Sequence, residues 1–336
     1  MKFGLWLTAQ HPESVTAAEA VAQHLEQVRT AAELGFDLAL AGQHFLPQPY
    51  WMLQNVPLLA RVAAEAGPMR LGTGISLLTL LNPVELAETV ATMDALTSGR
   101  FVLGVGQGYR TVEDDAFGIT ARRGRLFEEK VRIVRDLLSG ARVTADGPGY
   151  RLREAQLALP APSVPLWIAA NSDAGVRRAA RLGDTWLLNP HSDLVQLARQ
   201  VDLYHRERAA AGRPSTEDLP AAREVCVRPT TQEALDVARP HVEAKYAAYV
   251  SWGQDATMPS GDTLRRDWPD LVADGRFIIG SPEDCVARIV EHVDRLGVTE
   301  LVCRFQWPGT PQHEVLRSMR LFAAEVVPAV EEALRG

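Results

Sequence analysis

Several polar side chains in this sequence follow directly on short apolar runs, the place where reactive groups gather in α/β proteins. His44 comes after the run LALAG, with Gln43 just before it. An imidazole titrates near neutral pH, so it can act as a general base or hydrogen-bond a bound ring. The alternative is a histidine that only caps the end of a strand. Tyr109 closes a second such segment, GVGQGY.

Glycines and helix starts in the sequence could hold a flat, anionic ligand. Gly104, Gly106 and Gly108 lack a Cβ and let the backbone approach a ring closely, although glycines after strands are also common in turns. The segment AANSDAG precedes a predicted helix from Asp173, and GSPED precedes another after Gly280. The N–H groups at a helix start can bind a phosphate, or a serine or asparagine can simply cap them.

Familiar catalytic motifs are missing from the sequence, and this narrows the chemistry. It contains neither an HExxH metal motif nor a GxSxG nucleophile elbow. The segment GVGQGY is only a partial dinucleotide fingerprint, because Tyr109 stands at its last glycine position and no helical pattern begins there. A fold with few acids and bases at its candidate site favours reactivity supplied by a cofactor.

Strand-like apolar runs alternate with helix-period segments along the chain. The expected strands are Phe3–Thr8, Asp37–Ala41, Arg70–Leu78, Arg100–Val105, Val164–Ala169, Asp184–Leu188, Arg223–Arg228 and Val298–Phe305. The expected helices are Ala17–Leu34, Asn55–Ala66, Pro83–Leu96, Arg122–Leu138, Asp173–Leu182, Leu194–Ala211, Gln232–Tyr249, Ser281–Leu296 and Gln312–Leu334.

This alternation predicts a parallel sheet, and a closed (β/α)8 TIM barrel in a single domain over residues 1–336 fits it better than two doubly wound halves. A small hairpin insertion is expected after the fourth helix, in ARVTADGPGYRL, because Asp-Gly favours a tight turn. Residues 250–277 lack a clean period and predict an inserted loop or lid before the last βα unit.

Composition excludes several classes of protein. The chain of 336 residues has a formal net charge of -7, which gives no reason to expect a nucleic-acid partner. Its most apolar stretch is too short for a membrane helix, and the N-terminus does not form a signal pattern, so a cytoplasmic location is expected. Cys226, Cys285 and Cys303 are widely spaced without a CxxC pair, which argues against a disulfide framework and a metal site.

These residues resemble a known family, the bacterial luciferase-like flavin-dependent monooxygenases and their deazaflavin-dependent relatives, along essentially the whole chain. The resemblance rests on MKFGLWL, ELGFDLALAGQHF, VPLWIAANSDAGVRRAARLGD and IIGSPEDCVARIVEHVDRLGVTELVCRF. The most specific segment is LGTGISLLTLLNPVELAETVATMDALTSGRFVLGVGQGYRTVEDDAFGI, in which the motifs SGRF and GxGY occur in one order and spacing.

The resemblance implies a barrel that binds reduced FMN at its mouth, with O2 activated at the ring and a small organic substrate oxidised beside it. It also implies a non-prolyl cis peptide between Gly74 and Ile75, forming a bulge behind the ring. The cofactor-binding residues expected by position are Gly74, Ile75, Gly106, Gln107, Gly108, Arg125, Ala170, Asn171, Ser172 and Gly175. His44, Gln43 and Tyr109 are expected to orient or protonate the reacting groups.

The sequence departs from the family at several of these positions. Gln43 stands where luciferases have a catalytic histidine, and Gln107 stands where they have a phosphate-binding arginine. Gly106 replaces a reactive cysteine. In deazaflavin-dependent dehydrogenases the histidine of the HF pair matches His44, but their acidic residue after the GxG turn is Tyr109 here.

Three functions therefore stay open. The first is an FMN-dependent monooxygenase that receives reduced flavin from a separate reductase. The second is a deazaflavin-dependent oxidoreductase that uses the 8-hydroxy-5-deazaflavin coenzyme. The third is a non-catalytic barrel that acts as a structural partner. A homodimer is expected through Leu58, Leu59, Val62 and the helix Val84–Leu96, unless these residues only pack on the barrel. Residues that could line the substrate pocket are Trp6, His11, Tyr50, His191 and Gln306.

Overall fold

The computed structural model of the chain describes residues 1–216 and 218–335, in which parallel strands alternate with helices. The parallel strands are β1 (Lys2–Leu7), β3 (Leu38–Ala41), β5 (Arg70–Thr73), β6 (Ser76–Leu77), β7 (Phe101–Gly106), β10 (Leu166–Ala169), β11 (Thr185–Leu187), β12 (Pro220–Val227), β13 (Phe277–Gly280) and β14 (Glu300–Arg304). They form one curled sheet in the order β11-β10-β7-β5-β3-β1-β14-β12-β13, with β6 also paired to β7. An isolated parallel bridge between Leu188 and Ala221 connects the end of β11 to β12.

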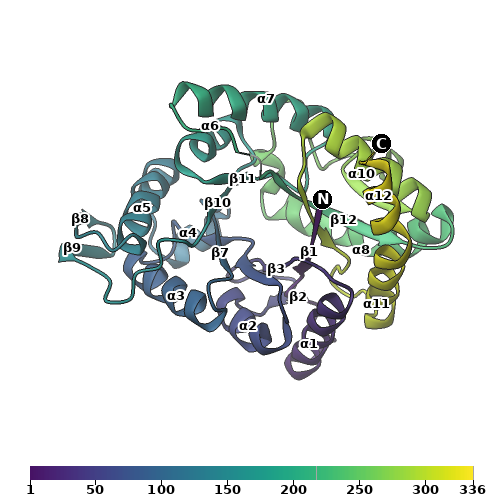
Figure 1. Cartoon of the computed structure of the whole chain (residues 1–336), viewed down its shortest axis with the longest axis horizontal. Coiled ribbons are helices and arrows are strands. Elements are labelled where there is room, and N and C mark those ends of the chain that lie inside the picture. The colour runs from purple at the N-terminus through teal and green to yellow at the C-terminus, as the bar shows by residue number, and fades with distance from the viewer. Residues whose placement is uncertain (217, 336) are drawn as a thin grey trace.

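Helices surround this sheet on its outer face (Figure 1). They are α1 (Ala17–Glu33), α2 (Asn55–Val62), α3 (Pro83–Leu96), α4 (Thr111–Ala116), α5 (Arg123–Leu138), α6 (Asp173–Leu182), α7 (Leu194–Ala210), α8 (Thr231–Ser251), α9 (Trp268–Ala273), α10 (Pro282–Leu296), α11 (Gln312–Leu321) and α12 (Val327–Ala333). Short turns η1 (Ala63–Glu65), η2 (Gln254–Thr257) and η3 (Phe322–Val326) complete them.

Local sequence explains where these helices begin and end. Ser281 and Asp284 form a capping box at the start of α10, and Gly297 ends that helix in the left-handed conformation, which glycine adopts without a Cβ clash. Asn82 caps α3, where Pro83 occupies a first-turn position that needs no N–H. These caps fix the helices that cover the strands.

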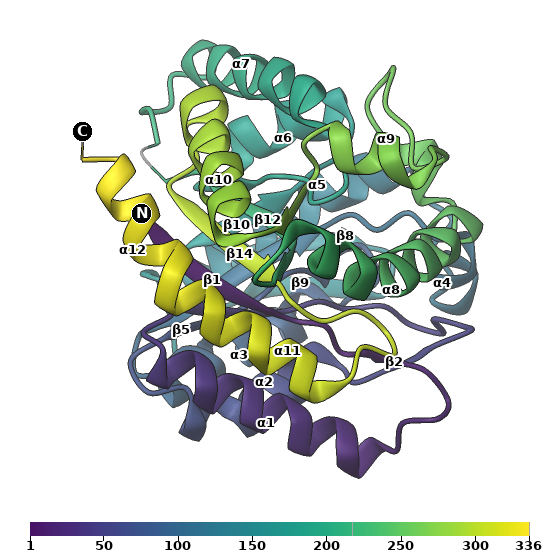
Figure 2. The ribbon, with the colours of Figure 1, turned by 90° about the vertical axis from the view of Figure 1, so that its right-hand side faces the viewer.

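Figure 2 shows both termini at one end of the molecule and α4, α9 and the strand β2 (Gln10–His11) at the other. The second end is where the parallel strands terminate, so the loops that follow the strands gather there. β2 pairs antiparallel with β4 (Trp51–Met52) beside this end. The candidate site must therefore be sought among these loops.

The predicted alternation of strands and helices is confirmed, and the structure adds α4, α9, β13 and the β2–β4 pair. Residues 250–277 are not an irregular loop, because they contain η2, α9 and the first residue of β13. Strand β13 has the sequence FIIG, which is too short to show a period, so the sequence analysis did not predict it. The third strand is divided into β5 and β6 at a cis peptide between Gly74 and Ile75, as the resemblance implied. The antiparallel strands β8 (Val143–Gly147) and β9 (Tyr150–Ala155) follow α5.

The expected dimer surface lies largely inside the chain's own core. Leu58, Leu59 and Val62 are buried against the sheet without any partner chain, and α3 likewise buries most of its apolar residues. An apolar face that is already covered gives little free energy on further association. The alternative, that these residues pack on the barrel, is the one the structure supports. Among the described helices, none is both long and apolar enough to cross a membrane.

Candidate active site

A deep cavity opens among the loops that follow the strands, with an empty volume of about 1240 Å³ including its mouth. The wall contains most of the residues expected from the sequence. They are Trp6, Gln43, His44, Gly74, Ile75, Gly106, Gln107, Gly108, Tyr109, Ala170, Asn171, Ser172, Gly175 and His191.

Two residues expected in the substrate pocket point elsewhere. His11 belongs to the β2–β4 pair, which turns its ring onto Trp51 and brings its Nε2 to 3.1 Å from Nε2 of His24. Gln306 accepts a hydrogen bond from Gln27 of α1 and therefore faces the helix layer. Neither residue lines the cavity, although Thr8, Ala9 and Gln10, which precede His11, do.

Tyr50 and Arg125 also lie outside the cavity wall. Tyr50 packs at the edge of Trp252, and Arg125 is an exposed residue in the first turn of α5. On the α6 side the cavity wall contains Arg178, held by a 2.9 Å bond from its Nε to Glu128. Arg178, which the sequence analysis did not single out, thus has the place in the wall that was expected for Arg125.

His44 is held by a carboxylate that the sequence analysis missed. Its Nδ1 lies 3.0 Å from Oε1 of Glu113, a residue of α4 that is 1% exposed. The same oxygen accepts bonds from the N–H of Phe45 and from Nη1 of Arg110. Glu113 is one helical turn beyond Tyr109, so a carboxylate reaches this wall although the position after GxG is a tyrosine.

The charges around this pair are set by burial and by its partners. Burial acts to raise the pKa of Glu113, but the bonds from His44 and Phe45 and the charge of Arg110 hold it below its ordinary value. Burial raises the pKa of Tyr109 well above its usual range, so its hydroxyl stays protonated. In the part of the chain that the structure describes, that hydroxyl has no hydrogen-bond partner. The wall therefore offers an imidazole, which is backed by an ionised carboxylate, and an O–H donor.

A floor of glycines faces these groups. A Cβ on Gly106 would come within 2.1 Å of Cδ1 of Ile75, and one on Gly104 within 2.0 Å of the Thr73 carbonyl oxygen. Thr73 further ties β5 to β7, since its hydroxyl bonds both the N–H and the carbonyl of Gly104. Only glycine fits this close approach, so the wall at Gly106 consists of backbone and of the Ile75 side chain packed against it.

The start of α6 provides an anion site at one side of the cavity. Ser172 caps the helix by accepting from the N–H of Gly175, and Asn171 bonds Thr257 of η2. The first N–H groups of a helix lack intrahelical partners, and the helix dipole favours a negative charge there. With Arg178 nearby, this edge combines backbone donors and a guanidinium.

Both polar atoms of the Gln43 side-chain amide form hydrogen bonds within the chain. Its Oε1 accepts from the N–H of Leu77, and its Nε2 donates to Gln54, which in turn donates to the carbonyl of His44. These bonds join the end of β3 to β6 and to the start of α2. Gln43 thus lies in the cavity wall as expected, with its polar atoms engaged in holding the His44 segment.

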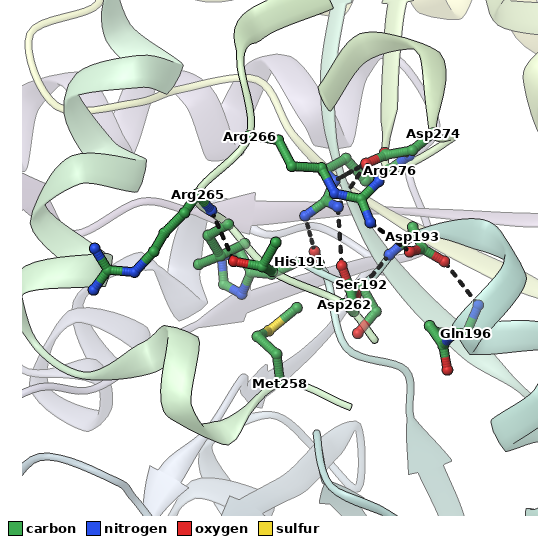
Figure 3. Close-up of polar contacts among 12 residues, drawn as sticks. His191, Ser192, Asp193, Gln196, Met258, Asp262, Arg265, Arg266, Asp274 and Arg276 are labelled. Atoms are coloured by element: carbon green, nitrogen blue, oxygen red, sulfur yellow. Dashed lines mark hydrogen bonds and ion pairs between the residues drawn. The ribbon is translucent and has the colours of Figure 1, made fainter. Parts of the chain in front are cut away.

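The cover segment, residues 252–276, is fastened over the cavity by a buried ionic cluster (Figure 3). Arg276 bonds Asp262 and Asp274, and its Nη1 donates to the carbonyl of His191 at 2.7 Å. Asp262 also accepts from the N–H of Asp193. The cluster thereby fixes the loop after β11, which carries His191 into the cavity wall.

Comparison with known proteins places this geometry in a family. The family model for luciferase-like monooxygenase matches residues 1–300. The chain belongs to the luciferase-like monooxygenase family. The family model and its relatives identify it as an oxidoreductase, and within residues 1–216 and 218–335 no cluster of side chains is suited to a metal ion.

Both monooxygenases and F420-dependent enzymes are among the proteins to which this chain is similar. The alkanal monooxygenase alpha chain of Photorhabdus laumondii is 24% identical over 100% of the chain and 99% of its own length. The F420-dependent glucose-6-phosphate dehydrogenase of Amycolatopsis mediterranei is 28% identical over 90% and 93%. Monooxygenase RslO1 from Streptomyces bottropensis superposes with a TM-score of 0.84, at 26% identity over 98% and 99% of the chains. Solved structures of the fold include an FMN complex.

Proposed function

We propose that this protein is a flavin-dependent monooxygenase that uses reduced FMN and O2 to oxidise a small organic substrate. The observation that carries the proposal is the arrangement of one cavity. A glycine floor lies at Gly106, the start of α6 with its free N–H groups lies at one side, and His44 lies in the wall with Glu113 behind it. This matches a ligand that is flat, has a phosphate and reacts at its ring.

The residues present fit FMN. At Gly106 the wall consists of backbone and of the Ile75 side chain, a surface against which the ring can lie, and Ser172 with Arg178 would hold the phosphate. When bound and reduced, FMN supplies the electrons that activate O2. The apolar wall, including Ile168 and Leu187, excludes bulk water from the reacting groups.

His44 is the group best placed to move a proton. Because Glu113 accepts from Nδ1–H, the other ring nitrogen, Nε2, can accept or return a proton at the cavity wall. Arg110 and Phe45 keep Glu113 in place, and an ionised Glu113 stabilises the protonated imidazole. Tyr109 adds a protonated hydroxyl as a donor to an oxygen atom of the substrate or cofactor.

A deazaflavin-dependent oxidoreductase is the second candidate. It is favoured by the full-length match to an F420-dependent dehydrogenase, and His44 matches the histidine of that group's HF pair. Deazaflavin-dependent dehydrogenases have an acidic residue at the position of Tyr109, and in this chain Glu113 supplies a carboxylate beside His44 instead. In this alternative the cavity serves hydride transfer and O2 has no part.

An anaerobic titration separates these candidates. Purified protein is titrated with reduced FMN and with the reduced 8-hydroxy-5-deazaflavin coenzyme while tryptophan fluorescence is followed. Tighter binding of FMN, followed by transfer of 18O from 18O2 into a product, supports the monooxygenase. Tighter binding of the deazaflavin contradicts it, and binding of neither coenzyme favours a structural partner.

His44→Ala tests the role of the imidazole within the same assay. It should lower turnover far more than it weakens FMN binding, because His44 acts on protons and not on the phosphate. A matched control is His313→Ala, an exposed histidine of α11. Equal losses of turnover and of FMN affinity in His44→Ala would contradict a catalytic role.

Several expectations join this proposal. We propose that the curled sheet forms the closed (β/α)8 barrel expected from the sequence, in a single domain over residues 1–336, with β13 as an added strand; the bridge between β11 and β12 supports this. A separate reductase supplies reduced flavin in the cytoplasm. The protein forms a homodimer through a surface other than the buried Leu58 and Leu59. Light scattering that shows a monomer at micromolar concentration would contradict the last point.

A further inference from the structure

A group of buried charges lies behind the inner wall of the cavity, away from the flavin groups described above. Glu224 of β12 and Lys245 of α8 are completely buried, and Arg304 at the end of β14 is about 5% exposed. Nη1 of Arg304 donates to Oε1 of Glu224 at 2.8 Å, and Lys245 bonds the same oxygen. Trp307 donates to the other carboxylate oxygen at 2.5 Å.

This group contains two cations and a single carboxylate. Burial acts to raise the pKa of Glu224, but Arg304 and Lys245 together hold it below its ordinary value, so it is ionised. The neighbouring carboxylates Asp262 and Asp274 are already paired, both with Arg276 and Asp274 also with Arg266. Buried charges are costly unless they are paired, so the group is short of one anion.

A second buried arginine increases the imbalance. Arg223 of β12 donates to His292 and to the carbonyl oxygens of Asn189 and Ala222, and none of these partners carries a negative charge. Its Nη2 has no partner within the described residues. The inner wall is thus positively charged on the β12 side as well.

Arg304 is the cation of this group that reaches the cavity. It is part of the cavity wall, and its guanidinium lies 4.4 Å from the ring centroid of Trp6. In the part of the chain that the structure describes, only Nη1 of its nitrogens has a hydrogen-bond partner. His191 lies in the same wall and is neutral, because burial and the charges of Lys245 and Arg304 hold its pKa well below the ordinary value.

We propose that the substrate carries an anionic oxygen group, either a carboxylate or an ionised enol or phenol, that binds Arg304 at the inner wall of the cavity. This inference rests on the proposed function, because it names the class of substrate that the same cavity takes. Arg304 offers a planar pair of donors suited to such oxygens. The cofactor phosphate would bind elsewhere, at Arg178. This residue lies on α6, which follows β10, and the strands β11 and β12 separate β10 from β14 in the sheet.

The state of Lys245 is consistent with a missing anion. Burial and repulsion by Arg304 lower the pKa of Lys245 to about 7, although Glu224 opposes this. An anion seated on Arg304 would relieve that repulsion. A neutral substrate would leave two cations competing for one carboxylate.

Matched pairs of small molecules test the inference. Calorimetry measures binding of acetate and acetamide, benzoate and benzamide, and 1-naphthoate and 1-naphthamide to the protein loaded with reduced FMN. Within at least one pair we expect the acid to bind at least tenfold more tightly than its amide. Absence of any preference for the acid in all three pairs would overturn the proposal.

Two variants assign the preference to Arg304. Arg304→Gln and Lys245→Met each leave one cation on Glu224, so neither should leave that carboxylate unpaired. Both should reduce the preference for the acid by tenfold or more while leaving amide binding within threefold. If Arg304→Gln fails to fold, as circular dichroism would show, Lys245→Met alone decides. An unchanged preference in the folded variants would contradict the assignment.

A control variant separates this proposal from the proposed cofactor. Arg178→Gln should weaken binding of reduced FMN and leave the preference for the acid unchanged, whereas Arg304→Gln should do the reverse. If the wild-type protein binds no FMN yet prefers the acids, the cofactor proposal fails and the inference about Arg304 stands. Loss of the preference in Arg178→Gln would place the anion site at α6 and overturn the inference.

Discussion

The replacement Arg178→Gln gives the sharpest test of how the cavity holds its cofactor. Arg178 lies in the cavity wall on α6, close to the capped helix start, and its Nε is fixed by Glu128. The guanidinium can therefore reach a phosphate that also meets the backbone N–H groups around Ser172. Glutamine keeps much of the side chain's length but removes the charge.

The magnitude follows from the type of contact. A hydrogen bond to a charged group contributes about 1.5–3 kcal/mol, so its loss should weaken binding of reduced FMN by roughly 10- to 150-fold. Riboflavin has the same ring and no phosphate, so its affinity should stay within about twofold. The protein itself should lose little stability, because the partly exposed pair of Arg178 and Glu128 is worth about 0–1 kcal/mol.

Anaerobic titrations of the reduced forms of FMN and riboflavin measure both affinities, with Arg125→Gln as the matched control. Arg125 was expected from the sequence to bind the phosphate but is exposed and outside the wall, so its replacement should leave both affinities unchanged. The reasoning would be refuted if Arg178→Gln weakened FMN and riboflavin equally. It would also be refuted if the loss appeared with Arg125→Gln instead.

Three further outcomes are expected. Glu113→Gln should lower turnover about 10- to 150-fold with little change in KM, because charge-assisted bonds to His44 are lost; unchanged turnover would contradict this. Gly106→Ala should weaken reduced FMN about 5- to 150-fold, since the added Cβ displaces Ile75; unchanged affinity would show that the ring lies elsewhere. Burial and the neighbouring His11 lower the pKa of His24 from 6.5 to about 3, so on acidification the unfolded chain binds a proton at His24 before the folded chain does. The share of the unfolding free energy that is due to His24 should therefore fall by ~2 kcal/mol between pH 6.5 and 5, as measured by urea titrations. His24→Asn should remove that share, and an identical pH dependence would refute it.

The sequence predicted where the site would form because parallel strands end together. His44, Tyr109 and Asn171 were expected to meet since each follows an apolar run, and all three lie in the cavity wall. The glycine floor followed from the lack of a Cβ at Gly106, a property that any neighbouring backbone must respect. Such positions depend on strand ends alone and need no knowledge of helix rotation.

The residues that the sequence missed depend on how helices are rotated. Arg125 lies in the first turn of α5 and Arg178 in the middle of α6, and only the packing of these helices decides which one faces the cavity. Leu126 and Phe127 take the buried face of α5, which leaves Arg125 in solvent. Glu113 sits on a helix of a single turn and a half, too short for a period to show its direction.

Helix α8 connects the two chemical regions of the cavity. Lys245 and Tyr249 are one turn apart on it, and Nζ of Lys245 lies 5.1 Å from the Tyr249 ring centroid. The Tyr249 ring in turn lies 6.3 Å from that of His44 and 5.2 Å from that of His191. An anion that draws Arg304 away from Glu224 would leave Lys245 as the remaining charged partner of that carboxylate, and the Lys245 ammonium lies beside the Tyr249 ring. A charge on the substrate at the inner wall can thus affect His44, the imidazole that moves the proton, through the packed side chains of α8.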